Sequence, residues 1–600
     1  MTFIFAALVL AVPDLPIGSF SGRTYGDWTQ TGKAFRKGPA SGAQLPQLEI
    51  VNAADDAVIS SEVEGDRPVG TLTSPEFKIE RNAIAFRIGG GGDEHALGVE
   101  LLLRGKVVRT ATGRRSDRLM PVSWDVRKLR GQMAQVRVVD EASGDWGHTN
   151  VDRIMQTDQP EQAPYAPGPL YHEALRPQFH FTARQWTVSH PEPVEHQEGW
   201  INDLNGLIYY DGEWHLFAQR WATCWLHAVS KDLIHWKELQ PAFWEESLGV
   251  GVQSGTCVVD YANTSGLAKD PKHPAMVAFW SRFDNRSQCL CYSLDHGRTW
   301  THYPGNPTFE RGERDPKVFW YSPGKHWVMI MYGDGAYHIL NSPDLLHWTD
   351  QHHPVPNSFE CPDFFELPLD GDVSKKKWVL IQGNGNYSVG TFDGHEFKEE
   401  GPRHACDIGP NFYATQSWHN TDTGDGRRIQ TAWMRFSYFP GMPFSQMVSF
   451  PCQLRLVSTP DGPRVYREPI AEVSHLSSGE KSWKDMELGS SLSLAEDGEL
   501  FRLRAEVSIP AGSKLTVSYR GVPVTFTSAS VASGDAHGTT SEVRTIEMLL
   551  DRTSIETFVN GGEISSTRFV LPSGHGLTMS AEGGAVRLKS VVLDRLKSVW

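Results

Sequence analysis

Three acidic residues that stand immediately before aromatic-rich segments could carry out chemistry together. Asp203 lies between two asparagines, Asp315 follows an arginine, and Glu360 follows a phenylalanine and precedes a cysteine and a proline. Hydrolysis of a glycosidic bond needs two carboxyl groups on opposite sides of it. One protonates the leaving oxygen, and the other attacks the sugar or activates water. The residue types therefore suit glycoside hydrolysis, provided that the fold brings them together.

The immediate neighbours suggest a different state for each acid. Apolar neighbours disfavour the ionised form, so we expect Glu360 to be the better proton donor. Amide neighbours can hold a carboxylate ionised, so we expect Asp203 to be the permanent anion. Arg314 is expected to keep Asp315 ionised and able to accept hydrogen bonds from sugar hydroxyls.

An internal repeat over residues 170–460 would position these acids. Four turns that each carry an aspartate are followed by an aromatic residue, and the aspartates are spaced 63, 49 and 49 residues apart: Asp232, Asp295, Asp344 and Asp393. A period of about 50 residues with about four strands is typical of a propeller blade, and the span fits five blades. We interpret the repeated aspartates as turn formers. The three other acids open blades, and the innermost strands of a propeller converge on a central channel.

The remaining segments also predict an all-β chain. Asp211-Gly212 between apolar runs predicts a hairpin directly after Asp203. Short strands separated by turns predict a β-sandwich over residues 21–157 and a second one over residues 461–600. The proline-rich residues 158–169 predict a linker.

Charge and composition exclude several classes of partner. The net charge of −15 argues against nucleic acid or an anionic membrane as the main partner. The seven cysteines include no Cys-x-x-Cys pair, which favours buried apolar residues over a disulfide framework or a zinc site. The 23 histidines show no metal-ligand spacing beside an acid. We therefore expect no cofactor and no metal.

The beginning of the chain has the character of an export signal. Residues 2–12 are apolar and too short to cross a bilayer. They are similar to the core of a secretory signal, although no Lys or Arg precedes them. We interpret residues 1–20 as a signal peptide and expect a secreted or periplasmic protein.

Three motifs together resemble those of glycoside hydrolase family 32, the invertases, inulinases and levanases. Trp200–Gly206 is similar to the family's Trp-Met-Asn-Asp-Pro-Asn-Gly motif, Arg314-Asp315-Pro316 to its Arg-Asp-Pro motif, and Glu360-Cys361 to its Glu-Cys motif. The resemblance covers roughly residues 175–600. Shorter matches are His227–Ser230, Ser254-Gly255, Asn411–Gln416 and Ala432–Met434.

The resemblance implies a retaining mechanism on terminal β-fructosides and a five-bladed propeller followed by a β-sandwich. It implies Asp203 as the nucleophile, Glu360 as the general acid and base, and Asp315 as the stabiliser of the transition state. The residues expected to bind the sugar are Asn202, Gln219, Trp225, Ser254 and Arg314.

Some positions depart from the family pattern. Leu204 replaces the proline of the first motif, and Gln253 stands where a phenylalanine is usual. Residues 219–227, which help to shape the sugar pocket in the family, form a shorter segment here, and Asn411 stands where an acid is common. We expect the chemistry to be retained, and these positions leave the preference among levan, inulin and sucrose open.

The favoured hypothesis is an exo-acting, levanase- or inulinase-like β-fructosidase that releases fructose from levan, inulin or sucrose. One alternative is a propeller glycosidase of the sister family, which acts on arabinosides and xylosides. Another is a protein that binds glycans without cleaving them. The released sugar distinguishes the two enzymes, and tight binding without products would identify the third.

Overall fold

The computed structural model describes most of the chain in two compact units. The described residues are 13–18, 24–42, 44–48, 50, 53–55, 57–62, 66–93, 96–113, 116–144, 146–158, 160, 171–184, 199–244, 248, 250–270, 272–421, 424–440 and 442–600. One unit is built from the strands before residue 168 and the other from the strands after it. The apolar residues 2–12 of the expected signal peptide lie outside the described residues.

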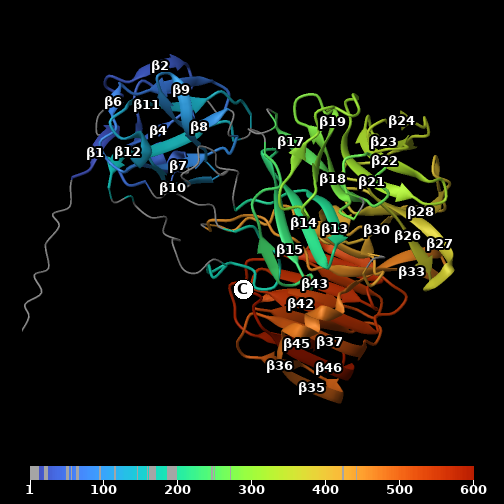
Figure 1. Cartoon of the computed structure of the whole chain (residues 1–600). Helices are drawn as coiled ribbons and strands as arrows, with labels where there is room; N and C mark the ends of the chain where they lie inside the picture. The colour runs from blue at the N-terminus through green and yellow to red at the C-terminus, as the bar shows by residue number, and fades with distance from the viewer. Residues whose placement is uncertain are drawn as a thin grey trace, which may run out of the picture. The chain divides into compact units, whose positions relative to one another are not determined.

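The N-terminal unit contains two antiparallel six-stranded sheets (Figure 1). The first sheet comprises β1 (Leu15–Gly18), β3 (Ala40–Ser41), β4 (Ala57–Ser60), β7 (Ala83–Gly90), β10 (Ser116–Asp125) and β12 (Thr149–Thr157). The second comprises β2 (Thr29–Gly32), β5 (Gly70–Thr73), β6 (Phe77–Lys78), β8 (Leu97–Leu103), β9 (Lys106–Ala111) and β11 (Met133–Asp140). Side chains of both sheets form one hydrophobic cluster. Strand β1, which pairs with β12, lies inside the range expected for the signal peptide.

The second unit begins with a five-bladed propeller, as predicted. The first three blades are β13 (Leu204–Tyr210), β14 (Glu213–Arg220), β15 (Cys224–Ser230) and β16 (Trp236–Glu238); β17 (Val252–Asp260), β18 (Ala275–Arg282), β19 (Gln288–Ser293) and β20 (Thr301–His302); and β21 (Arg314–Tyr321), β22 (His326–Gly333), β23 (Ala336–Ser342), β24 (Thr349–Asp350) and β25 (Val355–Pro356). The last two are β26 (Asp363–Leu369), β27 (Asp372–Ile381), β28 (Asn386–Phe392), β29 (Phe397–Glu399) and β30 (His404–Ala405); and β31 (Tyr413–Ser417), β32 (Ile429–Trp433), β33 (Cys452–Thr459) and β34 (Gly462–Pro469). Of the innermost strands, β13 contacts β17 and β31, β17 also contacts β21, and β31 also contacts β26.

The repeated aspartates form the turns that were predicted for them. The Asp232 carboxylate accepts hydrogen bonds from the backbone N–H groups of Ile234 and His235, at 3.1 and 2.9 Å. Asp344 binds the corresponding N–H groups of its own turn at 3.0 and 2.9 Å. A carboxylate that caps its own turn satisfies backbone donors locally, which explains why the residue recurs with each blade.

A sandwich of two six-stranded sheets follows the propeller and encloses a core of its own. Its sheets comprise β35 (Ser477–Leu488), β37 (Phe501–Ser508), β42 (Thr545–Asp551), β43 (Ser554–Val559), β44 (Ile564–Phe569) and β46 (Val586–Leu596), and β36 (Ser491–Ala495), β38 (Lys514–Tyr519), β39 (Val522–Phe526), β40 (Ser530–Ser533), β41 (Ala536–Thr539) and β45 (Leu577–Glu582). The expected boundary after residue 460 falls in the turn between β33 and β34, so the fifth blade continues to Pro469.

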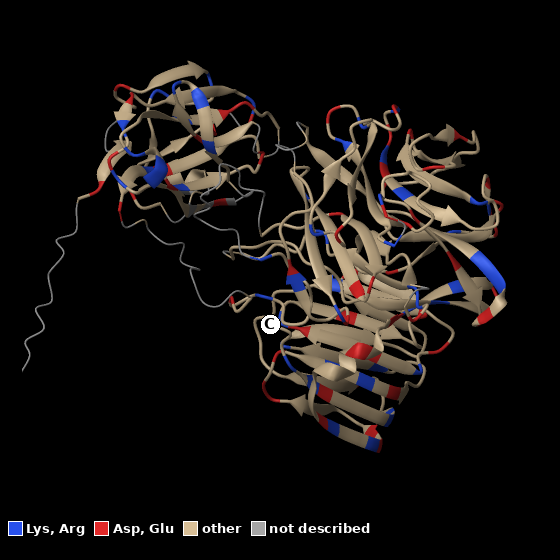
Figure 2. Ribbon diagram, in the orientation of Figure 1, with Lys and Arg blue, Asp and Glu red and all other residues tan. Residues whose placement is uncertain are grey.

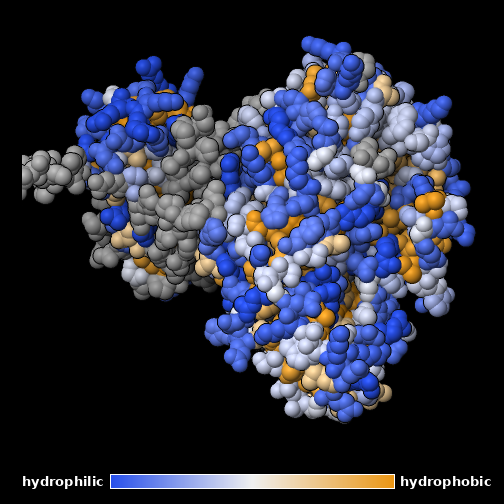
Figure 3. Space-filling model, turned by 60° about the horizontal axis from the view of Figure 1, so that its bottom comes forward, coloured by the Kyte–Doolittle hydropathy of each residue, from blue (hydrophilic) through white to orange (hydrophobic). Residues whose placement is uncertain are grey.

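Helical structure is limited to short turns. The described residues include α1 (Gln44–Gln47) and the 3₁₀ turns Arg127–Leu129 and Ala471–Leu476. No helix among them is long and apolar enough to span a bilayer. Charged residues of both signs are interspersed over the ribbon (Figure 2), and hydrophobic residues form small patches between polar ones on the face shown in Figure 3. All seven cysteines are buried, and none of them forms a disulfide.

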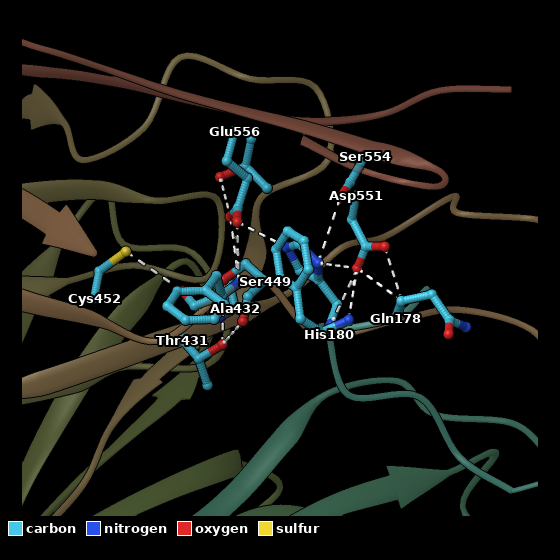
Figure 4. Close-up of polar contacts among 12 residues, drawn as sticks. Gln178, His180, Thr431, Ala432, Ser449, Cys452, Asp551, Ser554 and Glu556 are labelled. Atoms are coloured by element: carbon cyan, nitrogen blue, oxygen red, sulfur yellow. Dashed lines mark hydrogen bonds and ion pairs between the residues drawn. The ribbon is translucent and has the colours of Figure 1, made fainter. Parts of the chain in front are cut away.

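A buried charged network joins the propeller to the C-terminal sandwich (Figure 4). The ring of His180 lies between two carboxylates of the sandwich, with Nδ1 2.8 Å from Asp551 and Nε2 2.8 Å from Glu556. Arg467 of the fifth blade forms an ion pair of 3.1 Å with Asp407 and lies 4.0 Å from Glu556. The network therefore links the entry segment, the fifth blade and the sandwich through charges that water does not screen.

Candidate active site

The propeller brings together the three acids that the sequence singles out. Asp203 immediately precedes β13, Asp315 is the second residue of β21, and Glu360 lies three residues before β26. These are innermost strands of the first, third and fourth blades. The carboxylates interact electrostatically, because the negative charges of Asp315 and Glu360 both raise the pKa of Asp203. Residues more than 150 positions apart therefore form one acidic cluster.

Asp203 ends a chain of hydrogen bonds that all run in one direction. The Trp200 indole donates to the Asn202 side chain at 3.1 Å, and the Asn202 amide donates to Gln219 at 2.6 Å. Gln219 in turn donates to the Ser254 hydroxyl at 3.2 Å, and Ser254 donates to Asp203 at 2.9 Å. This chain fixes the direction in which the Asp203 carboxylate points.

The pKa of Asp203 is opposite to the expectation from its neighbours. Burial, and then the charge of Asp315, raise it to about 7, and the Ser254 hydrogen bond lowers it only in part. The flanking amides do not contact the carboxylate: Asn202 is bound to Gln219, and the Asn205 oxygen accepts from the Gly255 N–H group at 3.2 Å. The flanking amides therefore do not hold this carboxylate as an anion, contrary to the prediction.

Asp315 lies deeper in the cluster, in a strained backbone conformation. Its φ of +60° is in the left-handed region that side chains other than glycine rarely adopt. The carboxylate accepts a hydrogen bond from the Cys361 N–H group at 3.1 Å, and the Arg314 Nε atom lies 3.7 Å away. Burial outweighs both and raises the pKa of Asp315 to about 6. Arg314 therefore does not hold this carboxyl below its usual range, contrary to the prediction.

Glu360 is the acid that is held ionised. Burial alone would raise its pKa, but hydrogen bonds from the Tyr413 hydroxyl and from Arg314 outweigh burial and lower it. Arg314 Nη2 lies 2.5 Å from one carboxylate oxygen, and Tyr413 binds the other. The expectation that apolar neighbours raise the pKa of Glu360 is therefore wrong, because the two residues that lower it are not adjacent in the sequence.

The backbone at Glu360 is strained, and a buried tyrosine hydroxyl stabilises its conformation. Glu360 and Cys361 have φ values of +39° and +37°. The buried Tyr337 hydroxyl donates to the Glu360 carbonyl at 2.7 Å and to the Phe359 carbonyl at 3.1 Å. Strained conformations persist where the surroundings over-determine them, and they concentrate at functional sites. Tyr337 is thus a positioning residue for this acid.

Four of the five residues expected to bind sugar belong to the site, and one does not. Asn202, Gln219 and Ser254 lie in the chain that ends on Asp203, and Arg314 binds Glu360. Trp225 is 0 % exposed and packs in a hydrophobic cluster between the first and second blades. Its indole N–H donates to the Gln253 carbonyl at 3.0 Å. The prediction that Trp225 binds substrate is corrected: it supports the site from the core.

Two residues at the site were missed by reasoning from the sequence. Tyr413 begins the innermost strand of the fifth blade, a position equivalent to the heads of β13 and β21, and that equivalence could have identified it. Arg435, two residues after β32, lowers the pKa of both Asp203 and Glu360. Nothing in its local sequence indicates this. Among the described residues, no group of three or more His, Cys, Asp or Glu could hold a metal ion.

Known proteins share this architecture and these sequences. Residues 194–469 match the family model "Glycosyl hydrolases family 32 N-terminal domain", and residues 484–595 match "Glycosyl hydrolases family 32 C terminal". A levanase of Bacillus subtilis (strain 168) is 34 % identical over 501 residues, which cover 72 % of this chain and 72 % of the levanase.

Two fungal enzymes extend the comparison. An extracellular exo-inulinase of Aspergillus niger is 28 % identical over 531 residues, covering 72 % of this chain and 96 % of the inulinase. The crystal structure of an exo-inulinase from Aspergillus awamori shares the fold, with a TM-score of 0.61 and 24 % identity over 72 % of this chain and all of that one. The chain belongs to glycoside hydrolase family 32.

Proposed function

We propose that this chain is a β-fructosidase that removes single fructose units from the non-reducing ends of fructans, and from sucrose. The observation that carries the proposal is the cluster of Asp203, Asp315 and Glu360 at the heads of three blades. Relatives named levanase and exo-inulinase each align with 72 % of this chain, and they support fructan as the substrate class.

The proposed mechanism retains the configuration of the sugar. Asp203 attacks the anomeric carbon of the terminal fructosyl unit while Glu360 gives its proton to the glycosidic oxygen, which leaves with the rest of the substrate. Glu360 then takes a proton from water, and this water displaces Asp203 and releases fructose. Asp315 accepts hydrogen bonds from the sugar hydroxyls.

This mechanism starts from Asp203 ionised and Glu360 protonated, whereas the pKa of Asp203 is raised and that of Glu360 is lowered. Coupled carboxyl groups share their protons, so their titration belongs to the cluster as a whole. A bound fructosyl unit that displaces Arg314 or Tyr413 from Glu360 would raise the pKa of this acid. We therefore propose that binding of the sugar moves the proton onto Glu360.

The test is incubation with levan, inulin and sucrose, with products followed from the earliest times. From levan and inulin, fructose alone is expected at early times, and from sucrose equal amounts of fructose and glucose. A ladder of oligosaccharides would contradict exo action, and arabinose or xylose released from their glycosides instead would overturn the substrate class. Asp203→Asn and Glu360→Gln should each lower kcat by at least about 10³-fold. Asp344→Asn, the same chemical change in a blade turn, should leave kcat unchanged.

We also propose that the protein is exported and that its N-terminal unit is an accessory domain. The Aspergillus niger relative is named as extracellular, and 96 % of that enzyme aligns with 72 % of this chain. The family matches, over residues 194–469 and 484–595, leave out the N-terminal sheets. Removal of residues 1–157 should preserve the release of fructose from sucrose. Loss of that activity in a folded, truncated protein would contradict an accessory role.

A further inference from the structure

Arg435 is held beside the acidic cluster by aromatic rings. Its guanidinium carbon lies 4.6 Å from the centroid of the Tyr413 ring and 4.6 Å from that of Phe436, and the Trp433 ring is 5.8 Å away. Aromatic faces attract a guanidinium and restrict its orientation. The N–H groups at the edge of the planar guanidinium group remain available for hydrogen bonds.

Those N–H groups have no partner within the described part of the chain. Arg176 and Arg467 also lie over aromatic rings, but each forms an ion pair, with Glu173 and Asp407 respectively. Arg435 makes no side-chain hydrogen bond or ion pair to a described residue, although it is partly buried beside carboxylates. A guanidinium carries five donors, and a partly desolvated one without protein acceptors is suited to a ligand.

The position of Arg435 indicates which part of a substrate it would meet. Its ring partner Tyr413 donates to Glu360, the acid that would protonate the leaving oxygen. Its other partner, Phe436, is 54 % exposed, and Phe359, whose ring lies 6.4 Å from that of Tyr413, is 42 % exposed. Arg435 therefore contacts both the ring that binds the proton donor and a ring that faces solvent, and the leaving group has to depart past the proton donor toward solvent.

We propose that Arg435 determines specificity for the leaving group, by donating paired hydrogen bonds to adjacent hydroxyls of the sugar that is attached to the scissile fructosyl unit. The ligand class is a leaving group with neighbouring hydroxyls, such as the next fructosyl unit of a fructan or the glucosyl unit of sucrose. The inference rests on the proposed function, since it requires a β-fructoside as the substrate.

The test compares sugar and non-sugar leaving groups on the same variants. Arg435→Met keeps a long side chain between the rings and removes all donors, while Arg435→Lys keeps the charge and removes the planar fork. Rates are measured on inulin, levan and sucrose, and on an aryl β-fructofuranoside whose leaving group has no adjacent hydroxyls. For Arg435→Met, the ratio of kcat/KM for the sugar substrates to that for the aryl substrate should fall by about 10- to 100-fold, the loss expected for a charge-assisted hydrogen bond.

Arg435→Lys should recover only a small part of this ratio, because an ammonium group cannot bind two hydroxyls in the same geometry. Equal losses on all substrates would overturn the proposal, since Arg435 would then act on the fructosyl unit or on the carboxylates. An unchanged ratio would overturn it as well. Arg455→Met is the matched control: this arginine lies over the Tyr466 ring, at 5.9 Å, on the outer part of the fifth blade, and the ratio should not change.

Two further measurements separate the possible failures. Thermal unfolding of each variant shows whether the loss of ring contacts has destabilised the fold. The ratio of kcat/KM for the sugar substrates to that for the aryl substrate does not depend on the fraction of enzyme that is active, so partial inactivation cannot change it. A wild-type protein that releases fructose from none of the four substrates would overturn the proposed function and this inference together. The wild-type protein is measured first, so this failure of the proposed function is seen before any variant is compared.

Discussion

The ionisation state of Glu360 is decided by residues from two other blades. Arg314 reaches it from the third blade and Tyr413 from the fifth, and together they lower its pKa against the effect of burial. Among the described residues, the Asp203 carboxylate accepts a hydrogen bond from the Ser254 hydroxyl alone, and the charges of Asp315 and Glu360 raise its pKa while that of Arg435 lowers it. The pKa of Asp203 is thus raised and that of Glu360 lowered, so the proposed mechanism requires a bound substrate to raise the pKa of Glu360.

Removal of the Tyr413 hydroxyl should move the pH profile in a defined direction. Tyr413→Phe deletes a donor that stabilises ionised Glu360, so the pKa of this acid rises. Activity needs the protonated form and is lost as the pH rises through this pKa. The basic limb of kcat/KM against pH should therefore shift to higher pH. Tyr332→Phe is the control, because its ring contacts Arg314 and its hydroxyl binds no described residue; a shift toward lower pH in Tyr413→Phe would contradict the assignment.

The hairpin of β13 and β14 is the element that holds Asp203 in place. Asp211 and Gly212 form its two-residue turn with φ values of +49° and +81°, as the Asp-Gly pair predicts. Gly206, three residues after the acid, has a φ of +49°, and a Cβ atom there would lie 2.8 Å from the Cys257 Cβ atom of the second blade. The first blade thus approaches the second more closely than any side chain at this position would allow.

Two alanine substitutions in this hairpin should differ in their cost. Gly212→Ala meets open space, and its positive φ should lower the free energy of unfolding by about 1–2 kcal/mol. Gly206→Ala adds a clash with Cys257 and should cost more, and it should lower kcat because the loop before β13 has to move. Thermal unfolding and sucrose hydrolysis measure the two effects. Equal losses of stability at both positions would contradict the close approach of the blades.

The whole catalytic unit depends on a charge buried between its two domains. His180 is fully buried between Asp551 and Glu556 (Figure 4). Burial alone would lower its pKa, but the two carboxylates outweigh burial and raise it to about 9. The histidine is therefore a fixed cation at neutral pH. It ties the segment that enters the propeller to the strands β42 and β43 of the sandwich.

This cation makes the stability of the unit dependent on pH. The folded pKa of about 9 lies above the unfolded value of 6.5, so the stabilisation is complete below about pH 6.5 and is lost as the pH rises through about 9. His180→Gln leaves two buried carboxylates without their cation and should cost about 3–5 kcal/mol. Its midpoint of thermal unfolding should also vary less than that of the wild type between pH 6.5 and 9.

The exposed His347, which pairs with Asp344 in a blade turn, provides the matched control. His347→Gln should change the free energy of unfolding by no more than about 0.5 kcal/mol, since surface ion pairs contribute little. A wild-type unfolding midpoint that stays constant from pH 6.5 to 9 would contradict a charged His180.

Local patterns in the sequence determined the fold class and the acids of the site. The spacing of the turn aspartates records the blade repeat, because each blade caps its own turn, and the Asp211-Gly212 pair determines its hairpin through backbone sterics alone. Asp203, Asp315 and Glu360 could be selected because innermost strands of a propeller must converge.

The environment of each acid was decided only by the tertiary structure. The partners of Glu360 come from positions 46 and 53 residues away, so its pKa falls where its neighbours predicted a rise. Contacts between blades also decide two other environments: Trp225 is buried in the core, and Arg435 lies beside the carboxylates. The alternation of residues along a strand depends on near neighbours in the sequence. The burial of a side chain in the site, and the electrostatic potential that acts on it, depend on residues from every blade around it.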